Sequence, residues 1–277
     1  MVRDINDYTL NAMYFSPTGT TEKIVKKISA ELMCCIKKSG EVKCVDFTSH
    51  EVREKPVNFN RDDIVILGVP VYAGRVPNVL LKYLNTLKSD GALAVAVVVY
   101  GNRNFDDALV ELEDILELNG FRVIAAGAFI GEHSFSDILA AGRPDEEDLH
   151  DAASFAEQIC EKIACGKECD SFVVLGNKPY NPYYRPIDKQ GCYVDIRKVK
   201  PKTEESCVDC KLCAESCPMG SINYEDVSLT DGICIKCGAC IKKCPVNAKY
   251  FDDEDYLRHK EELELEFAER RKAAFFL

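Results

Sequence analysis

Eight of the fifteen cysteines fall into two groups with the same spacing. Each group follows the pattern C-x2-C-x2-C-x3-C and is followed by a proline, Pro218 or Pro245. The second group repeats the first at a constant offset of 27 residues, which indicates an internal duplication. Soft thiolate ligands suit iron-sulfur clusters or zinc far better than magnesium or calcium. The members are Cys207, Cys210, Cys213 and Cys217, then Cys234, Cys237, Cys240 and Cys244.

This spacing resembles that of bacterial ferredoxins with two 4Fe-4S clusters. Structural zinc usually takes its ligands as two pairs, and a disulfide framework is the other alternative. In the ferredoxin pattern the fourth cysteine of each group ligates the cluster of the other group. The resemblance therefore implies two crossed ligand sets. They are Cys207, Cys210, Cys213 and Cys244 for one cluster, and Cys234, Cys237, Cys240 and Cys217 for the other.

A second chemical feature lies near the N-terminus, in the loop Ser16-Pro17-Thr18-Gly19-Thr20-Thr21. It follows a β-prone segment and precedes residues 22–33, whose apolar side chains recur at helical spacing. Hydroxyl donors, a flexible Gly19 and the free amides of a helix start suit a phosphate group. The lysine of a nucleoside-triphosphate loop is absent, which favours a mononucleotide monophosphate over ATP. A serine/threonine helix cap without any ligand is the alternative.

The elements around this loop alternate between strand and helix. Such alternation predicts an α/β fold with a five-stranded, doubly wound parallel sheet, whose ligand crevice lies at the carboxyl ends of the strands. Expected strands cover residues 9–15, 42–47, 63–69, 92–100 and 121–130. Four helices are expected: one directly after the first loop, one over residues 77–88, one that ends at residue 118, and one over residues 145–164.

Three loops at the predicted crevice have the chemistry that a flat, polar-edged ring needs. Tyr72 and Phe105 can stack on a ring, and the backbone groups of Gly74, Gly101 and Asn102 can meet its polar rim. Together with the first loop, which is similar to the T-x-T-G-x-T phosphate loop, they make residues 8–165 resemble the flavodoxin-like FMN domains. The resemblance implies an FMN site formed by Ser16, Thr18, Gly19, Thr20, Thr21, Pro70, Tyr72, Ala73, Gly74, Gly101, Asn102, Arg103 and Phe105.

The chain departs from the common flavodoxin pattern in two ways. It has no tryptophan, so Tyr72 takes the place of a ring-stacking tryptophan. Asn102 and Arg103 stand where an acidic residue usually follows the glycine of the third loop. Arg103 would favour a reduced, anionic flavin if it lies near the ring; a surface ion pair with Asp106 or Asp107 is the alternative.

His133 is the one candidate catalytic residue. It follows the fifth predicted strand on the ligand side, where it could contact the flavin or give a proton to a substrate. The alternative is a loop histidine whose hydrogen bonds go to the backbone. We expect Asp137 and Arg143 in the same loop to be solvated.

The chain divides into four parts. Residues 1–166 form the predicted flavodoxin-like domain, and 167–203 form a linker rich in proline and tyrosine, which either packs on the rim of the sheet or covers the flavin crevice. Residues 204–250 form the ferredoxin-like unit, which is too small to fold by core burial alone, so its clusters also stabilise it. Residues 251–277 are predicted to form a helix that packs across both domains or binds a partner.

Bulk properties restrict location and partners. The formal net charge of −11 disfavours nucleic acid and is compatible with a redox partner that carries a basic patch. No signal peptide or apolar run of membrane-spanning length is evident, so we expect a cytoplasmic protein that does not bind membranes. Among the other seven cysteines, Cys34, Cys44 and Cys160 are expected in the core.

These features predict an electron-transfer protein. Two 4Fe-4S clusters and one FMN would link a low-potential redox donor to a protein acceptor. No G-x-G-x-x-G motif follows a strand, so a nicotinamide site is not indicated. The alternative is a flavin-dependent reductase of a small acceptor such as a quinone.

Overall fold

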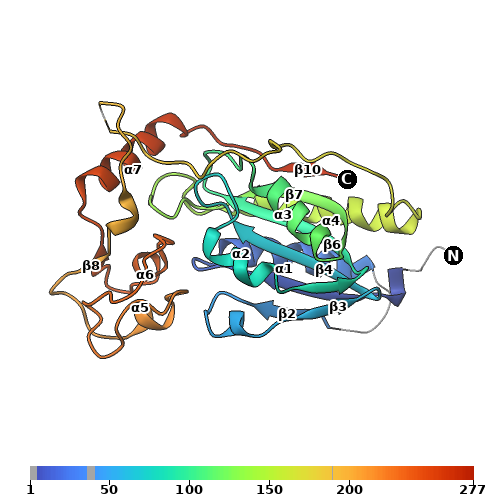
Figure 1. The fold of residues 1–277 in the computed structure, drawn as a ribbon, viewed down its shortest axis with the longest axis horizontal. Helices are drawn as coiled ribbons and strands as arrows, with labels where there is room; N and C mark the ends of the chain where they lie inside the picture. The colour runs from blue at the N-terminus through green and yellow to red at the C-terminus, as the bar shows by residue number, and fades with distance from the viewer. Residues whose placement is uncertain (1–4, 36–40, 189) are drawn as a thin grey trace.

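A computed structural model describes residues 5–35, 41–188 and 190–277. Its centre is a six-stranded sheet with the order β10-β7-β6-β4-β1-β2, in which all strands but β10 run parallel (Figure 1). The five parallel strands confirm the predicted doubly wound α/β sheet. They are β1 (Thr9–Tyr14), β2 (Lys43–Asp46), β4 (Asp63–Pro70), β6 (Leu93–Tyr100) and β7 (Arg122–Ile130).

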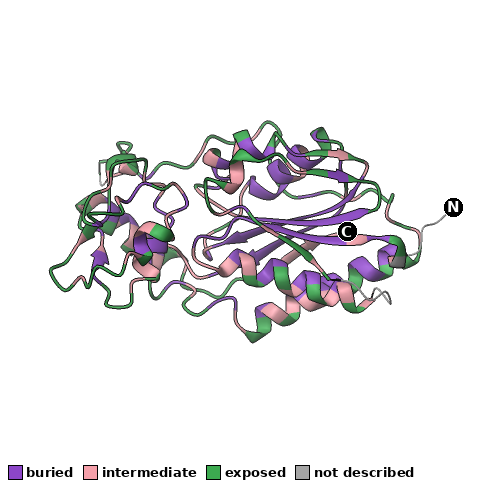
Figure 2. Ribbon diagram, turned by 90° about the horizontal axis from the view of Figure 1, so that it is seen from below, coloured by how far each residue is buried: buried purple, intermediate pink, exposed green. Residues whose placement is uncertain are grey.

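Helices cover both faces of the sheet. α1 (Thr20–Cys35) and α4 (Glu146–Ala164) contribute to one buried cluster, and α2 (Asn78–Leu84) and α3 (Ala108–Leu118) contribute to the other. Figure 2 shows the central strands almost entirely buried, whereas the outer faces of the helices are exposed. The layers are therefore helix, sheet and helix.

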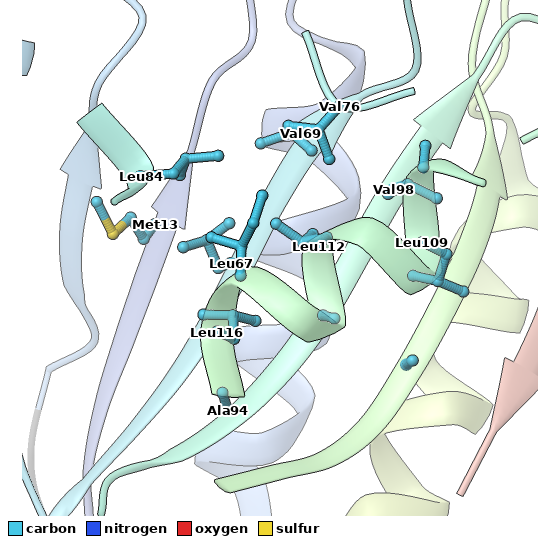
Figure 3. Close-up of a cluster of buried hydrophobic side chains, with 14 of the residues drawn as sticks. Met13, Leu67, Val69, Val76, Leu84, Ala94, Val98, Leu109, Leu112 and Leu116 are labelled. Carbon is cyan, nitrogen blue, oxygen red and sulfur yellow. The ribbon is translucent and has the colours of Figure 1, made fainter. Parts of the chain in front are cut away.

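The central strands explain why the sheet is buried on both sides. In β4, Ile64 and Ile66 face the α1/α4 layer, whereas Val65 and Leu67 face the α2/α3 layer. A continuous apolar run is what a parallel strand between two helical layers requires. Figure 3 shows Leu67 packed with Leu112 and Leu116 of α3. This packing fixes the carboxyl ends of the strands, where the predicted site lies.

The C-terminal segment differs from the predicted continuous helix. α7 (Glu254–Glu266) ends early, and β10 (Ala274–Phe276) pairs antiparallel with β7 at the edge of the sheet. Phe275 packs against Phe129 and Phe155, which lie in β7 and α4. The free edge of β7 supplies a hydrogen-bonding partner that local sequence does not reveal.

The ferredoxin-like unit lies at one end of the molecule, beside the carboxyl ends of the sheet strands (Figure 1). Its short elements are β8 (Lys202–Thr203), α5 (Leu212–Glu215), α6 (Ala239–Lys242) and β9 (Lys249–Tyr250), with β8 and β9 antiparallel.

Outside this unit, β3 (Asn58–Asn60) and β5 (Lys88–Asp90) form a small parallel pair that the sequence did not suggest. Three 3₁₀ turns in the described residues cover Ile5–Asp7, Val52–Glu54 and Ile196–Lys198.

The expectations for the cysteines outside the two groups are partly wrong. Cys34 and Cys44 are exposed, and Cys160 is buried but forms a disulfide with Cys35 that joins α1 to α4. The two residues are 125 positions apart, so the contact depends on the tertiary fold.

The linker is ordered but has little regular structure where it is described. Tyr180 and Tyr183 pack on the Arg75 guanidinium at the rim of the sheet. Asp107 accepts hydrogen bonds from the backbone amides of Asn177 and Asn181, at 2.8 and 2.7 Å. Rim packing, one of the two expected roles, is therefore present. Within the described residues, no helix is both long and apolar enough to cross a membrane.

Candidate functional site

The eight cysteines of the two groups line two separate cavities. One cavity is lined by Cys207, Cys210, Cys213 and Cys244, and the other by Cys234, Cys237, Cys240 and Cys217. Each cavity thus takes three cysteines from one repeat and the fourth from the other repeat. We call them the first and second thiol cavities.

The donor chemistry of both cavities fits an iron-sulfur cluster. Each is lined by four thiols and mostly by apolar side chains, with lysines but no carboxylate or imidazole among the lining residues. Within the described part of the chain, no three metal-binding side chains converge on one point as they would around a single ion. Burial raises the pKa of Cys237 to about 12, so without a metal this thiol carries a proton at neutral pH, and binding iron as a thiolate would require its loss.

The backbone repeats the duplication seen in the sequence. Three pairs of residues related by the 27-residue offset have positive φ angles: Asp209 and Lys236, Lys211 and Gly238, and Gly220 and Asn247. Two sulfur contacts repeat as well. The Ser221 amide donates to Cys217 Sγ at 3.3 Å, and the Ala248 amide donates to Cys244 Sγ at 3.1 Å.

The sequence difference between the repeats at Lys211 and Gly238 has a structural reason. Both residues are left-handed, with φ of 65° and 75°. A Cβ atom on Gly238 would lie 2.5 Å from the carbonyl oxygen of Ser134 in the flavodoxin-like domain. Lys211 instead places its ammonium on Asp209, at 2.8 Å. The second repeat therefore requires glycine because it faces the other domain, and the first repeat does not.

The loop before α1 has the geometry of an anion site. Gly19 has a φ of 89°, which glycine adopts without strain. The buried Ser16 hydroxyl accepts a hydrogen bond from the Glu22 amide at 2.9 Å, and the Ser16 amide donates to Thr48 Oγ1 at 2.8 Å. These bonds hold the loop against the helix start, whose amides and dipole favour a phosphate.

A third cavity lies between this loop and the loops that follow β4, β6 and β7. We call it the flavin cavity, because its chemistry fits a phosphate at one end and a ring at the other. Of the predicted FMN residues, Thr18, Thr20, Thr21, Pro70, Tyr72 and Gly101 line it. Pro17, Val71, Val99, Gly131, Glu132 and Ser134 also line it although they were not predicted, and so does Cys237 of the second thiol cavity.

Tyr72 lines the flavin cavity and lies near two cysteines of the second thiol cavity. It is half-buried, and its pKa is raised well above the ordinary value, first by burial and then by its interaction with Cys237 and Cys234. Its phenol therefore stays neutral. The residue predicted to stack on the ring is thus also close to two cysteines of the ferredoxin-like unit.

His133 lines the flavin cavity in a defined neutral state. Its Nδ1 accepts a hydrogen bond from the Phe135 amide at 3.1 Å, so the ring proton lies on Nε2. Burial lowers its pKa to about 4, and the positive charges of His259, Lys242 and Arg103 act in the same direction. At neutral pH the side chain can donate a hydrogen bond but holds no spare proton. It has a backbone partner, as the alternative expected, and it also lines the cavity.

Several predicted FMN residues have other partners. Arg103 forms an ion pair with Asp106 and lies over the Tyr184 ring at 5.2 Å from its centroid, and Phe105 packs on Tyr100. Seven of the predicted FMN residues are not among those that line the flavin cavity: Ser16, Gly19, Ala73, Gly74, Asn102, Arg103 and Phe105.

Asn102 is bonded to the C-terminal segment. Its Nδ2 donates to the carbonyls of Phe267 and Glu269 at 2.6 and 2.8 Å, and its Oδ1 accepts from the Arg271 amide at 3.2 Å. Arg143, which the sequence suggested to be solvated, is buried instead. It forms an ion pair with Asp148 and donates to the Arg271 carbonyl at 3.0 Å.

Two cations anchor the ferredoxin-like unit to the flavodoxin-like domain. Lys242 contacts Glu132 at 2.7 Å, the Ser136 carbonyl at 2.5 Å and Asp137 at 2.7 Å. Asp137 is exposed as expected, but it is paired. Arg53 donates to the Pro218 carbonyl at 2.6 Å. Both anchors adjoin the second ligand set, since Lys242 lies two residues after Cys240 and Pro218 directly follows Cys217.

Two parts of the chain match models of known protein families. Residues 12–119 match the family model described as a flavodoxin domain, and residues 230–250 match the model of a 4Fe-4S binding domain. None of the curated proteins compared with the chain matches it.

Solved structures similar to part of the chain include oxidised Flavodoxin 2 from Bacillus cereus, with 20% identity and a TM-score of 0.41 over 56% of this chain and 99% of that one. A flavodoxin from Streptococcus pneumonia TIGR4 has 20% identity and a TM-score of 0.39 over the same shares. A flavodoxin from the domain Archaea has 14% identity and a TM-score of 0.41, again over 56% and 99%.

The flavodoxin domain implies a flavin, and the 4Fe-4S domain implies a 4Fe-4S cluster. The chain is therefore a flavodoxin domain fused to a 4Fe-4S ferredoxin motif, a combination that indicates electron transfer.

Proposed function

We propose that this protein is an electron carrier with two 4Fe-4S clusters and one FMN, placed in the order first thiol cavity, second thiol cavity, flavin cavity. The observation that carries the proposal is the position of Cys237, which lines both the second thiol cavity and the flavin cavity. When bound, the clusters would supply one-electron steps and FMN would supply one- or two-electron steps.

The duplicated backbone supports two clusters although the family model matches only the second repeat. Both repeats have the same left-handed positions and the same amide-to-sulfur contacts. Hydrogen bonds to ligand sulfur stabilise the reduced state of a cluster. Because the two repeats have the same local geometry, we expect each of them to bind a cluster.

The anchors of the ferredoxin-like unit support transfer within a fixed frame. Lys242 and Arg53 hold segments from both halves of the second ligand set. Gly238 allows the second repeat to approach the Ser134 carbonyl closely. Transfer between the second cluster and FMN would then need no movement of one domain relative to the other.

Protein partners are favoured over a small acceptor because other segments hold the loops around the flavin cavity. The Tyr184 amide of the linker donates to the Ala73 carbonyl at 2.9 Å. Asn102 in the third loop binds the C-terminal segment. Because these loops are held by other segments of the chain, we expect electrons to enter or leave through the exposed end of the ferredoxin-like unit.

A flavin-dependent reductase of a small acceptor is the second candidate. It rests on His133, whose Nε2 proton is available at the cavity. A neutral histidine with a pKa of about 4 can orient an acceptor by a hydrogen bond, but it is a weak source of protons at neutral pH.

The order of the cofactors is testable with two cysteine variants. Cys210→Ser removes a ligand of the first cluster, and Cys237→Ser removes a ligand of the second. Each should lower the iron content from about eight to about four per chain. After rapid reduction with methyl viologen radical, electrons should still equilibrate quickly between the remaining cluster and FMN in Cys210→Ser, but slowly in Cys237→Ser. Equal rates in the two variants, each confirmed to be folded and to hold four irons, would contradict the order.

A further inference from the structure

The first thiol cavity opens at the surface through an apolar rim. Val208, Leu212 and Val246 line this cavity together with its cysteines, and their relative exposures are 61, 42 and 39%. Cys210 is exposed as well. Large apolar side chains gathered around one opening are typical of a contact surface rather than of scattered surface residues.

The second thiol cavity has two buried cysteines, Cys237 and Cys240, and one side of it faces the other domain. Its lining residues Ala239 and Phe251 are 0 and 8% exposed, whereas Ile233 is 68% exposed. Loops of the flavodoxin domain approach it through the Gly238–Ser134 contact. The flavodoxin-like domain therefore covers the Gly238 side of the second cavity, whereas Cys210 leaves a ligand of the first cluster exposed at the surface.

Exposed acidic residues lie near Val208 and Leu212 in sequence, whereas the exposed charged residue nearest to Val246 in sequence is Lys243. Lys211 is half-buried, and it is already paired with Asp209 and bonded to the Glu225 carbonyl. Lys249, the other lysine that lines the cavity, is buried and bonded to Thr203. The exposed acids between residues 204 and 226 are Glu204, Glu205, Asp209, Glu215, Glu225 and Asp226.

We propose that Val208, Leu212 and Val246, with the acidic residues around them, form the docking surface for a one-electron redox protein whose contact face has an apolar centre and a basic rim. The inference rests on the proposed function and adds the place and chemistry of the partner. One electron passes between the partner and the first cluster, so one protein is oxidised and the other reduced by one unit, with no bond or proton exchanged.

The surface has the arrangement expected for a transient interface. An apolar centre excludes water, and charged residues at the rim raise the association rate with a partner of opposite charge. Such steering weakens as salt is added. The exposed position of the first cluster and the acidic rim therefore both favour a one-electron redox protein with a basic rim.

Cytochrome c is a suitable probe because it is a basic protein that accepts one electron. Chemically reduced holoprotein is mixed with oxidised cytochrome c, and haem reduction is followed by stopped flow at several salt concentrations. The variant Asp209→Asn/Glu215→Gln/Glu225→Gln should lower the second-order rate about tenfold at low salt. The variant Val208→Ser/Val246→Ser should lower it at every salt concentration.

The matched control is Glu117→Gln/Glu157→Gln/Glu161→Gln. It removes the same number of exposed charges from α3 and α4, away from the ferredoxin-like unit (Figure 1). This control should stay within twofold of the parent rate. Equal slowing in both triple variants, or no slowing in either, would overturn the docking surface, with iron counts confirming that the clusters are intact.

Two further outcomes have separate meanings. If light scattering shows a dimer that Val208→Ser/Val246→Ser dissociates, a second copy of the chain covers this face and the proposal is wrong. If FMN and the clusters fail to exchange electrons before cytochrome c is added, the proposed function fails. The dependence of cluster oxidation on the acidic residues can still be measured in that case.

Discussion

At the scale of single residues, the junction between the two domains depends on Gly238. Its left-handed φ of 75° and the nearby Ser134 carbonyl leave no room for a side chain. Lys211, at the equivalent position of the first repeat, has the same backbone conformation without such a neighbour. The two positions therefore provide a matched pair of sites.

Replacing Gly238 with alanine should destabilise the junction. The left-handed conformation costs about 1–2 kcal/mol with a side chain, and the contact with Ser134 adds to this. We expect a lower thermal unfolding temperature and slower electron transfer between the second cluster and FMN. Lys211→Ala is the control, because it adds no Cβ atom and should change stability by less than about 0.5 kcal/mol. Equal effects in the two variants would contradict this account of the junction.

His133 should make stability depend on pH. Its folded pKa of about 4 lies below the ordinary value of 6.5, so the unfolded state binds more protons between these values. The contribution of His133 to the free energy of unfolding is fully present above pH 6.5 and is lost as the pH falls toward 4. At pH 5.5 the free energy of unfolding is lower by about 1.4 kcal/mol.

The measurement is the unfolding temperature of the FMN-loaded protein at pH 8 and pH 5.5. The parent protein should lose more stability than His133→Gln over this interval, by about 2–4 °C. If the two proteins lose the same amount, His133 is not a buried neutral histidine.

Some residue-level features followed from the sequence and others did not. The cysteine groups were evident because ligand spacing within one loop is local, and the crossed sets then followed from the resemblance to ferredoxins. Arg143 was misjudged because a charged residue is usually solvated, whereas its partners Asp148 and Arg271 are brought to it by the fold. The Cys35–Cys160 disulfide depends in the same way on the packing of α1 against α4.

At the scale of elements, α6 fixes the ferredoxin-like unit to the loop after β7 through Lys242. Lys242→Met removes three contacts, including two with carboxylates, while its neighbour Lys243 is exposed. We expect Lys242→Met to slow electron transfer between the second cluster and FMN with iron and FMN contents unchanged. Lys243→Met, which removes the same charge, should leave this rate unaltered; slowing in both variants would indicate a general charge effect.

The C-terminal segment should support FMN binding. Asn102, in the loop after β6, makes three hydrogen bonds to Phe267, Glu269 and Arg271. Deleting residues 267–277 leaves these polar atoms without their partners, at a cost of about 1–3 kcal/mol in loop order. We expect the FMN dissociation constant to rise about tenfold in a fluorescence titration. An unchanged constant would show that the segment only covers the sheet edge.

The elements that could be predicted are those with long, periodic apolar patterns. β4 and β6 are continuous apolar runs, and their burial followed directly from that pattern. β10 was missed because three residues after a charged helix have no strand signature of their own. Its strand conformation comes from pairing with the free edge of β7, which is a property of the assembled sheet.

At the scale of the whole molecule, the chain places the ferredoxin-like unit against the carboxyl ends of the sheet strands (Figure 1). The sequence predicted both sites but not which cluster lies nearer the flavin, since that depends on how the domains pack. The proposed order rests on Cys237, which lines both the second thiol cavity and the flavin cavity.

The most direct test of this account is time-resolved electron transfer in the anaerobic holoprotein. The preparation should contain about eight irons and one FMN per chain. After rapid reduction of the clusters, their absorbance and that of FMN should change together at a rate independent of protein concentration, as expected for transfer within one fixed molecule. A rate proportional to protein concentration, or a folded preparation with four irons or no FMN, would contradict it.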